Sequence, residues 1–220
     1  MSDIIYEIQS KIKSKILFDY DMGKSCWFRT GGKAKGFITI NNLKDLKTIV
    51  SYEDKIKYSI IGVGSNILVR DSGYDGLIIK LGKNFNKIKI NNNTLTVGAA
   101  VLDTNLAKFA LKNLIKDFEF FIGIPGTVGG AVKMNAGCYG SQTSDNLKRI
   151  LVLNSQGRVQ YIDLKELNLE YRSSKLDKKS IILQADFNFD HSTYDEILKK
   201  NNYIKLKREE TQPLKEMTSG

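Results

Sequence analysis

The spacing of hydrophobic residues along the chain alternates between two periods, which predicts a mixed α+β fold. Residues 36–40 (GFITI) alternate as a strand does, residues 43–54 follow the helical period, and residues 58–62 (YSIIG) form a short apolar run. This order predicts a strand, a helix and a second strand in succession, which is a βαβ unit.

The N-terminal segment predicts a helix. Its isoleucines fall at helical spacing, at Ile4, Ile5, Ile8, Ile12 and Ile16. We interpret the segment as an amphipathic helix that packs on the body of the protein, with a membrane-surface or partner helix as the alternative. Acids and lysines interrupt it throughout, so it lacks the continuous apolar run of a signal peptide or a membrane span, and we expect no membrane partner.

Later segments predict further strands and two helices. The asparagines at positions 91–93 favour a tight turn between two strands, and Asp103 is expected to cap the next helix. The expected strands cover residues 77–81, 87–90, 95–98, 149–153, 158–164 and 181–189. The expected helices cover residues 103–114 and 194–210, the second ending at Pro213 and residues 218–220.

Composition indicates a globular protein with small anionic ligands rather than nucleic acid as its partners. With 41% hydrophobic residues, a chain of 220 residues can bury a core. The net charge of +10 would suit nucleic acid, but the lysines are scattered singly and no basic stripe is interleaved with aromatic residues. A basic surface still draws anions such as a dinucleotide or a nucleotide sugar toward a cleft.

The two cysteines, Cys26 and Cys138, are far apart, and neither has a metal-ligand spacing to the single histidine, His191. We therefore expect reduced thiols, a cytoplasmic location and no metal site. His191 has no histidine partner, and we interpret it as a surface turn residue.

Two partial phosphate-binding motifs are rejected. Residues 23–25 (GKS) resemble the end of a P-loop, but Phe18 stands where that motif requires glycine. Residues 62–64 (GVG) begin a dinucleotide fingerprint, but Ile67 occupies its sixth position, so a standard Rossmann fold is not expected.

The first glycine loop, residues 62–71 (GVGSNILVRD), directly follows an apolar strand. Its glycines let backbone N–H groups face a concavity, and Ser65 and Asn66 add donors, which suits a pyrophosphate. An ordinary tight turn would explain the same residues.

The second glycine segment, residues 122–140 (IGIPGTVGGAVKMNAGCYG), has six glycines in nineteen positions and almost no charge. Such density favours close approach to a large flat ligand or its phosphates, with a loop threading a crowded core as the alternative. Gly129 and Gly130 are expected to open a helix or nest whose amides face an anion. We expect the two glycine segments to hold a dinucleotide between them.

Residues 171–174 read YRSS, and Arg172 precedes a strand expected beside the second glycine segment. Its guanidinium is either a surface charge or a clamp for a carboxylate or enolate. Composition alone favours the surface charge.

The segments RTGGKAKGFITI, GVGSNILVRD, GLIIKLG, GIPGTVGGAVKMNAGCYG, YRSS and REETQPLKEMTSG occur in this order. In this combination the chain resembles the UDP-N-acetylenolpyruvoylglucosamine reductase family from about residue 20 onward. The resemblance implies a two-subdomain FAD-binding fold of the p-cresol methylhydroxylase (vanillyl-alcohol oxidase) type. The expected division is an N-terminal helix (1–19), FAD-binding subdomains (20–81 and 82–190), and a helix with the stub of a C-terminal substrate-binding domain (191–220).

The resemblance also implies a reaction and its residues. FAD, with NADPH as the hydride donor, would serve to reduce the enolpyruvyl group of a nucleotide sugar to UDP-N-acetylmuramate in peptidoglycan synthesis. Tyr171 and Arg172 match the family's active-site pair, and Arg172 would stabilise enolate-like charge. The positions expected to bind FAD are Gly62, Val63, Gly64, Ser65, Asn66, Ile67, Ile124, Pro125, Gly126, Thr127, Gly129, Gly130, Ala131, Asn135, Ala136 and Gly137.

In the family, the segment ending TSG is followed by the proton-donor serine and by a domain that completes the substrate site, whereas this sequence ends at Gly220. We therefore expect this chain to bind flavin better than it turns over substrate. Two alternatives stay open: a flavin-binding module of the same fold without catalysis, and another flavin oxidase of that fold. Nothing in the sequence specifies an oligomeric state.

Overall fold

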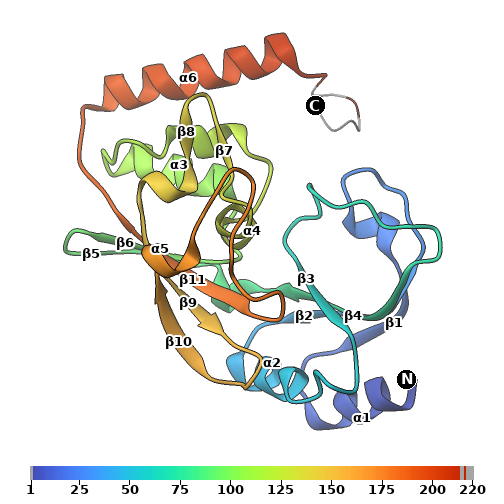
Figure 1. Ribbon diagram of the computed structural model, residues 1–220. Helices are drawn as coiled ribbons and strands as arrows, with labels where there is room; N and C mark the ends of the chain where they lie inside the picture. The colour runs from blue at the N-terminus through green and yellow to red at the C-terminus, as the bar shows by residue number, and fades with distance from the viewer. Residues whose placement is uncertain (1, 214–215, 217–220) are drawn as a thin grey trace.

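The computed structural model describes residues 2–213 and 216, in two lobes that each hold one main β-sheet (Figure 1). The first lobe contains α1 (Ser2–Lys11), β1 (Ile16–Asp21), the 3₁₀ helix η1 (Met22–Ser25), β2 (Lys33–Ile40), α2 (Leu43–Val50), β3 (Tyr58–Ile61) and β4 (Tyr74–Leu81). The second contains η2 (Lys83–Phe85), β5 (Ile88–Asn91), β6 (Thr94–Gly98), α3 (Asp103–Lys112), η3 (Glu119–Gly123), α4 (Val128–Lys133), β7 (Gly137–Cys138), β8 (Ser141–Gln142), η4 (Thr143–Asp145), β9 (Leu147–Leu153), β10 (Val159–Asp163), α5 (Leu164–Leu167), β11 (Ile181–Asn188) and α6 (Tyr194–Thr211).

The first sheet has the strand order β1-β2-β4-β3. Strands β2, β4 and β3 run parallel, and β1 pairs antiparallel with β2 at the edge. The expected βαβ unit is confirmed by β2, α2 and β3, with β4 inserted between the two strands. Helix α2 forms because Leu46, Ile49 and Val50 share a buried face and because Asn42 accepts the N–H of Asp45 as a cap.

The N-terminal helix is confirmed over Ser2–Lys11, but its expected continuation to residue 19 is wrong, because β1 begins at Ile16. The N–H of Ile16 donates to the side chain of Gln9, and Ser14 donates its N–H and its hydroxyl to the Asp45 carboxylate. These hydrogen bonds turn the chain into β1. Ile16 still lies in the same core as the helix, which explains why its position fits the helical period.

The second sheet is antiparallel, in the order β10-β9-β11-β6-β5. Both expected hairpins form, one between β5 and β6 and one between β9 and β10. The main hydrophobic core continues from the first lobe into the second, where Phe118, Phe121 and Phe187 pack ring against ring. The lobes are therefore packed together and not joined as separate beads.

Two helices complete the second lobe. The N-cap of α3 is Leu102, so the expected capping role of Asp103 is wrong; Asp103 is the first helical residue and is fully buried. Helix α6 lies against η3 and α3 and buries Ile197 and Ile204. It ends at Thr211, and residues 218–220, which we expected to help end it, lie outside the described residues.

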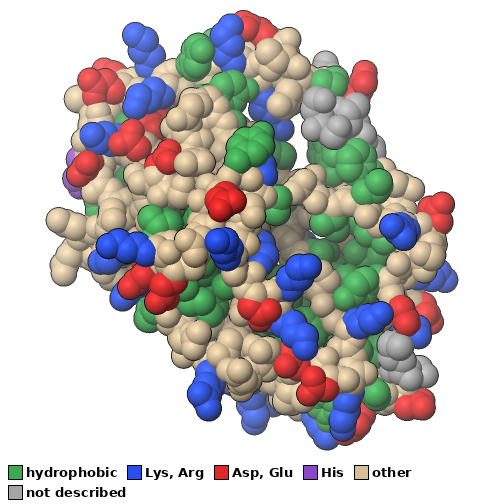
Figure 2. Space-filling view, viewed as in Figure 1, with side chains coloured by type: hydrophobic (Ala, Val, Ile, Leu, Met, Phe, Trp, Pro, Cys, Tyr) green, Lys and Arg blue, Asp and Glu red, His purple; other side chains and the backbone are tan. Residues whose placement is uncertain are grey.

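A hollow opens between the two lobes, with hydrophobic and basic side chains around it (Figure 2). The loop after β3 approaches it from the first lobe and α4 from the second (Figure 1). Within the described part of the chain, no helix has the length and apolar character needed to cross a membrane.

Candidate functional site

The loop after β3 carries backbone N–H groups that have no acceptor among the described residues. No residue from Gly62 to Val69 donates its N–H to another described residue. Gly64 is buried with φ +74, and a side chain there would collide with the carbonyl oxygen of Ser25. The carbonyl of Gly64 accepts the N–H of Trp27 at 2.9 Å, which fastens the loop to the segment before β2. Unpaired amides in a fixed loop form a site for an anion.

The second glycine segment uses several of its amides within the protein. Val128 and Gly129 donate their N–H groups to the carbonyl oxygens of Val101 and Ala99, each at 2.9 Å. Helix α4 begins at Val128, so the expected helix start is confirmed, but the Gly129 amide does not face an anion as expected. The N–H groups of Thr127 and Gly130 donate to no other described residue.

The atoms around each glycine show at which positions a side chain would collide with the protein itself. A Cβ on Gly126 would lie 2.5 Å from Oδ2 of Asp103, and one on Gly137 would collide with the Ser141 carbonyl. A Cβ on Gly130 would meet only Thr127 Oγ1 at 3.7 Å, an ordinary contact. Since glycine costs a helix about 1 kcal/mol relative to alanine, a ligand lying against α4 would account for Gly130.

The two glycine segments meet at Gly62 and Thr127. A Cβ on Gly62 would overlap the Thr127 side chain, so the loop after β3 lies directly against the start of α4. Thr127 is buried, and its hydroxyl does not cap the helix. The unpaired amides of the first loop thus lie close to those of Thr127 and Gly130.

Asn135 joins the second glycine segment to the loop that carries the YRSS motif. It is buried, has φ 39, and donates its side-chain amide to Gln142 Oε1 at 3.1 Å and to Glu170 O at 3.2 Å. Its Oδ1 accepts the N–H of Ser144 at 3.0 Å. The side chain is therefore engaged with protein partners and positions residues 170–172.

Arg172 lies beside the second glycine segment, and the strand that was expected there, β11, contacts α4. Its guanidinium donates to Gly137 O at 2.7 Å and more weakly to Asn135 O at 3.4 Å, and it lies 4.9 Å from the ring centroid of Tyr171. Arg172 has φ 53, a strained conformation for a residue other than glycine, and such strain is concentrated at functional sites. The remaining guanidinium donors can bind an anion next to the exposed Tyr171 ring.

Asp103 is a buried acid. Its place at the start of a helix made the sequence predict a capping residue there. Neither carboxylate oxygen has a hydrogen-bond partner among the described residues, and burial raises the pKa of this carboxyl well above its usual range. Its N–H donates to Gly126 O at 3.1 Å, so the residue supports the second glycine segment. An acid at a helix start is common, so the sequence gives no signal that this one is buried.

The donors at this junction suit the diphosphate of a dinucleotide. The available groups are backbone N–H donors and an arginine, which match phosphate oxygens and carboxylates. Among the residues that the structure describes, no group of three or more His, Cys, Asp or Glu side chains could hold a metal ion.

Comparison with known proteins agrees with this chemistry. Residues 34–163 match the FAD binding domain family. A UDP-N-acetylenolpyruvoylglucosamine reductase from Rickettsia conorii is 41% identical over 210 residues, covering 95% of this chain and 71% of that protein. The crystal structure of the corresponding reductase from Thermus caldophilus superposes with a TM-score of 0.82 at 26% identity, over 94% of this chain and 73% of that one. A BBE-like protein from Physcomitrella patens (TM-score 0.62, 16% identity, 85% of this chain and 44% of that one) shares the fold, so the expected two-subdomain FAD-binding fold is confirmed.

Proposed function

Since the chain belongs to the UDP-N-acetylenolpyruvoylglucosamine reductase family, we propose that it serves the NADPH-driven, FAD-dependent reduction of UDP-N-acetylglucosamine enolpyruvate to UDP-N-acetylmuramate. In this reaction the double bond of the enolpyruvyl group gains a hydride and a proton, and NADPH becomes NADP⁺. The match to FAD binding domains and the relatives' shared activity support the proposal.

The residues at the junction of the lobes fit FAD. The loop from Gly62 to Ile67 would hold the diphosphate on its unpaired N–H groups, and Thr127 and Gly130 would add donors from the start of α4. When bound, FAD supplies hydride-transfer chemistry that no amino-acid side chain provides.

Arg172 would bind the carboxylate of the enolpyruvyl group and stabilise the negative charge that develops beside it during hydride transfer. Tyr171 packs on the guanidinium, and Asn135 fixes the loop that carries both residues. These contacts hold the arginine in place before substrate arrives, which reduces the free-energy cost of orienting it.

We also propose a cytoplasmic location. Cys26 and Cys138 are both free thiols, the state that a reducing compartment maintains.

The observation that carries the proposal is the run of amides from Gly62 to Val69, which lies against α4 and has no acceptor in the part of the chain that the structure describes. The test loads the chain with FAD, adds NADPH without oxygen and follows the loss of oxidised-flavin absorbance. The enolpyruvyl sugar is then added, and the return of absorbance and the product mass are measured. Both absorbance changes are expected, with turnover weak compared with FAD binding. Bound FAD that responds to neither reagent would favour the non-catalytic flavin module.

A further inference from the structure

Helix α6 carries apolar side chains on two opposite faces. Its inner face buries Ile197 and Ile204 against the second lobe, where the helix contacts η3 and α3. Its outer face turns away from that lobe (Figure 1) and holds a shallow groove of about 480 Å³. The groove is lined by residues of α6 alone: Asp195, Leu198, Lys199, Asn202, Tyr203 and Leu206.

An outer face of this kind is unusual for a helix on the surface of a protein. Such a helix normally has one apolar stripe, toward the core, and polar residues on its other side. On α6, however, Leu206 is 58% exposed and Tyr203 is 55% exposed. Single exposed hydrophobic residues are common, but these two share one groove with the half-buried Leu198. Exposed apolar residues grouped in this way mark a surface that another molecule covers.

The order of side chains along the groove is complementary to its own reverse. When a second copy of α6 lies antiparallel, with the pair centred between positions 200 and 201, Leu198 is level with Tyr203 of the second copy. In the same arrangement Lys199 is level with Asn202 of the second copy. Each residue of the groove therefore meets the level of another groove residue, which is the pattern that a twofold contact between identical surfaces requires.

The charges of α6 favour the same antiparallel direction. Asp195 lies in the first turn, and Lys205 lies toward the other end of the helix. Neither side chain forms an ion pair or hydrogen bond with another described residue. In the antiparallel pair, Asp195 is within one residue of the level of Lys205 of the second copy, so opposite charges meet at both ends. A parallel pair would bring like charges together, and exposed charges of this kind contribute more to direction than to affinity.

We propose that the outer face of α6 is a homodimer interface, in which two copies of the helix pack antiparallel about a twofold axis and enclose the groove. The helix has 18 residues and is about 27 Å long. A single pair of such helices buries less than the roughly 1,200–2,000 Å² of a standard stable interface, so we expect a weak dimer with a dissociation constant on the order of 10 µM. The inference does not depend on the proposed function, because none of the positions expected to bind FAD lies on α6.

The test is sedimentation of the 220-residue chain over a range of about 1 to 500 µM. The mass should rise from that of a monomer, 24.8 kDa, toward twice that value. Leu206→Glu should weaken the dimer by at least about tenfold, because it places a carboxylate in an apolar groove and level with Asp195 of the second copy. Ile90→Glu, at an exposed apolar residue of β5, is the matched control and should dimerise as the parent does.

A charge reversal tests the direction of packing. Asp195→Lys and Lys205→Glu should each weaken the dimer, since each brings like charges to the ends of the antiparallel pair. The double variant should recover most of the parent's affinity, which non-specific adhesion of an apolar face would not reproduce. Tyr203→Lys is a second variant of the same face as Leu206→Glu, so a folding defect in one of them, detected by circular dichroism, does not decide the test.

Three results would overturn the proposal: a chain that stays monomeric at the highest concentration, a Leu206→Glu variant that dimerises as the Ile90→Glu variant does, or a double charge variant that is not restored. The first two would assign the groove to a different partner. FAD titration of the same proteins keeps the two claims apart. A chain that binds FAD but stays monomeric overturns this inference alone, and a chain that dimerises but does not bind FAD overturns the proposed function alone.

Discussion

Thr127 fills the space into which a side chain on Gly62 would project, so the loop after β3 and the start of α4 touch at this pair of residues. The contact joins one segment from each lobe at the place where the unpaired amides gather. The width of the proposed cofactor site therefore depends on how closely these two residues approach.

Gly62→Ala should force the two lobes apart at this point. Overpacking of this kind costs about 1–3 kcal/mol of unfolding free energy. Thr127→Ala removes the overlapping hydroxyl and methyl groups, so the double variant should recover most of the loss. Urea unfolding of the two single variants and the double variant measures the coupling. Additive changes in unfolding free energy would show that the side chains at positions 62 and 127 do not clash.

Gly130→Ala should have opposite effects on stability and on cofactor binding. Alanine stabilises the flavin-free helix by up to about 1 kcal/mol, because its Cβ has open space. The same methyl group should lower FAD affinity on the order of tenfold, or ~1.4 kcal/mol, by keeping the ligand from the backbone. Thermal unfolding without FAD and titration with FAD check the two effects. Lys108→Ala, on the exposed face of α3, is the control and should leave FAD binding intact.

Arg172→Ala should leave FAD binding nearly intact and slow the re-oxidation of reduced flavin by the enolpyruvyl sugar. The expected decrease is about 10²-fold or more, since removing one electrostatic donor at a reacting centre costs on this scale. Stopped-flow absorbance measures the rate. Arg158→Ala, at the turn of the β9–β10 hairpin, removes the same charge outside the YRSS loop and should leave the rate unchanged. An equal re-oxidation rate in the two variants would show that Arg172 does not act on the substrate.

Asp103 should make the protein less stable as pH rises. Its pKa in the folded state is raised by burial above the ordinary value of about 3.9, so the folded chain holds a proton that the unfolded chain has already released. The contribution of Asp103 to the free energy of unfolding is therefore greatest below that ordinary value and falls as the pH rises toward the folded-state pKa. Asp103→Asn removes this pH dependence. The free energy of unfolding of the variant should therefore rise relative to that of the parent as the pH increases. Urea unfolding across this pH range measures the difference, and a constant difference between the two proteins would contradict the assignment.

Local patterns were enough to predict most of the secondary structure. The hairpins of the second sheet follow from alternating residues around turn formers, and α2 follows from a single apolar face with an asparagine cap. The end of α1 was missed because it depends on hydrogen bonds to Asp45, a residue far along the chain. Ile16 fits both the helical period and the core position of a strand.

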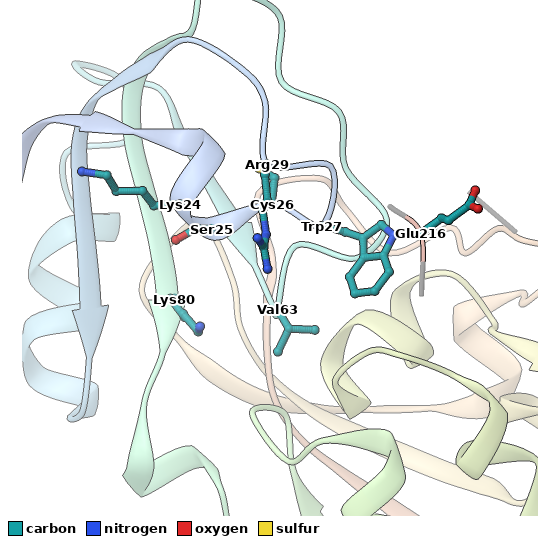
Figure 3. A pocket seen from close by; sticks show the side chains of 8 residues that line it. All are labelled: Lys24, Ser25, Cys26, Trp27, Arg29, Val63, Lys80 and Glu216. Atoms are coloured by element: carbon teal, nitrogen blue, oxygen red, sulfur yellow. The ribbon is translucent and has the colours of Figure 1, made fainter. Parts of the chain in front are cut away.

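The candidate site could be predicted from the sequence only where its backbone requires glycine. Glycine density identified both segments at the junction and the YRSS motif identified Arg172, but the partners of each amide depend on tertiary contacts. The carbonyl oxygen of Ala99 accepts the N–H of Gly129, whereas the N–H of Gly130 donates to none of the residues that the structure describes. A cavity of about 330 Å³ in the first lobe, lined by residues that include Arg29 and Lys80 (Figure 3), was missed for the same reason, because it joins residues that are about fifty positions apart.

The most direct test of the central claim, that the two glycine segments together hold FAD, is a titration of the purified chain with FAD. Flavin absorbance and fluorescence are followed, and circular dichroism confirms folding. The account predicts saturation at one FAD per chain, with weaker binding by Gly130→Ala and unchanged binding by Lys108→Ala. A folded chain that leaves the flavin spectrum unchanged, or equal affinity in all three proteins, would contradict it.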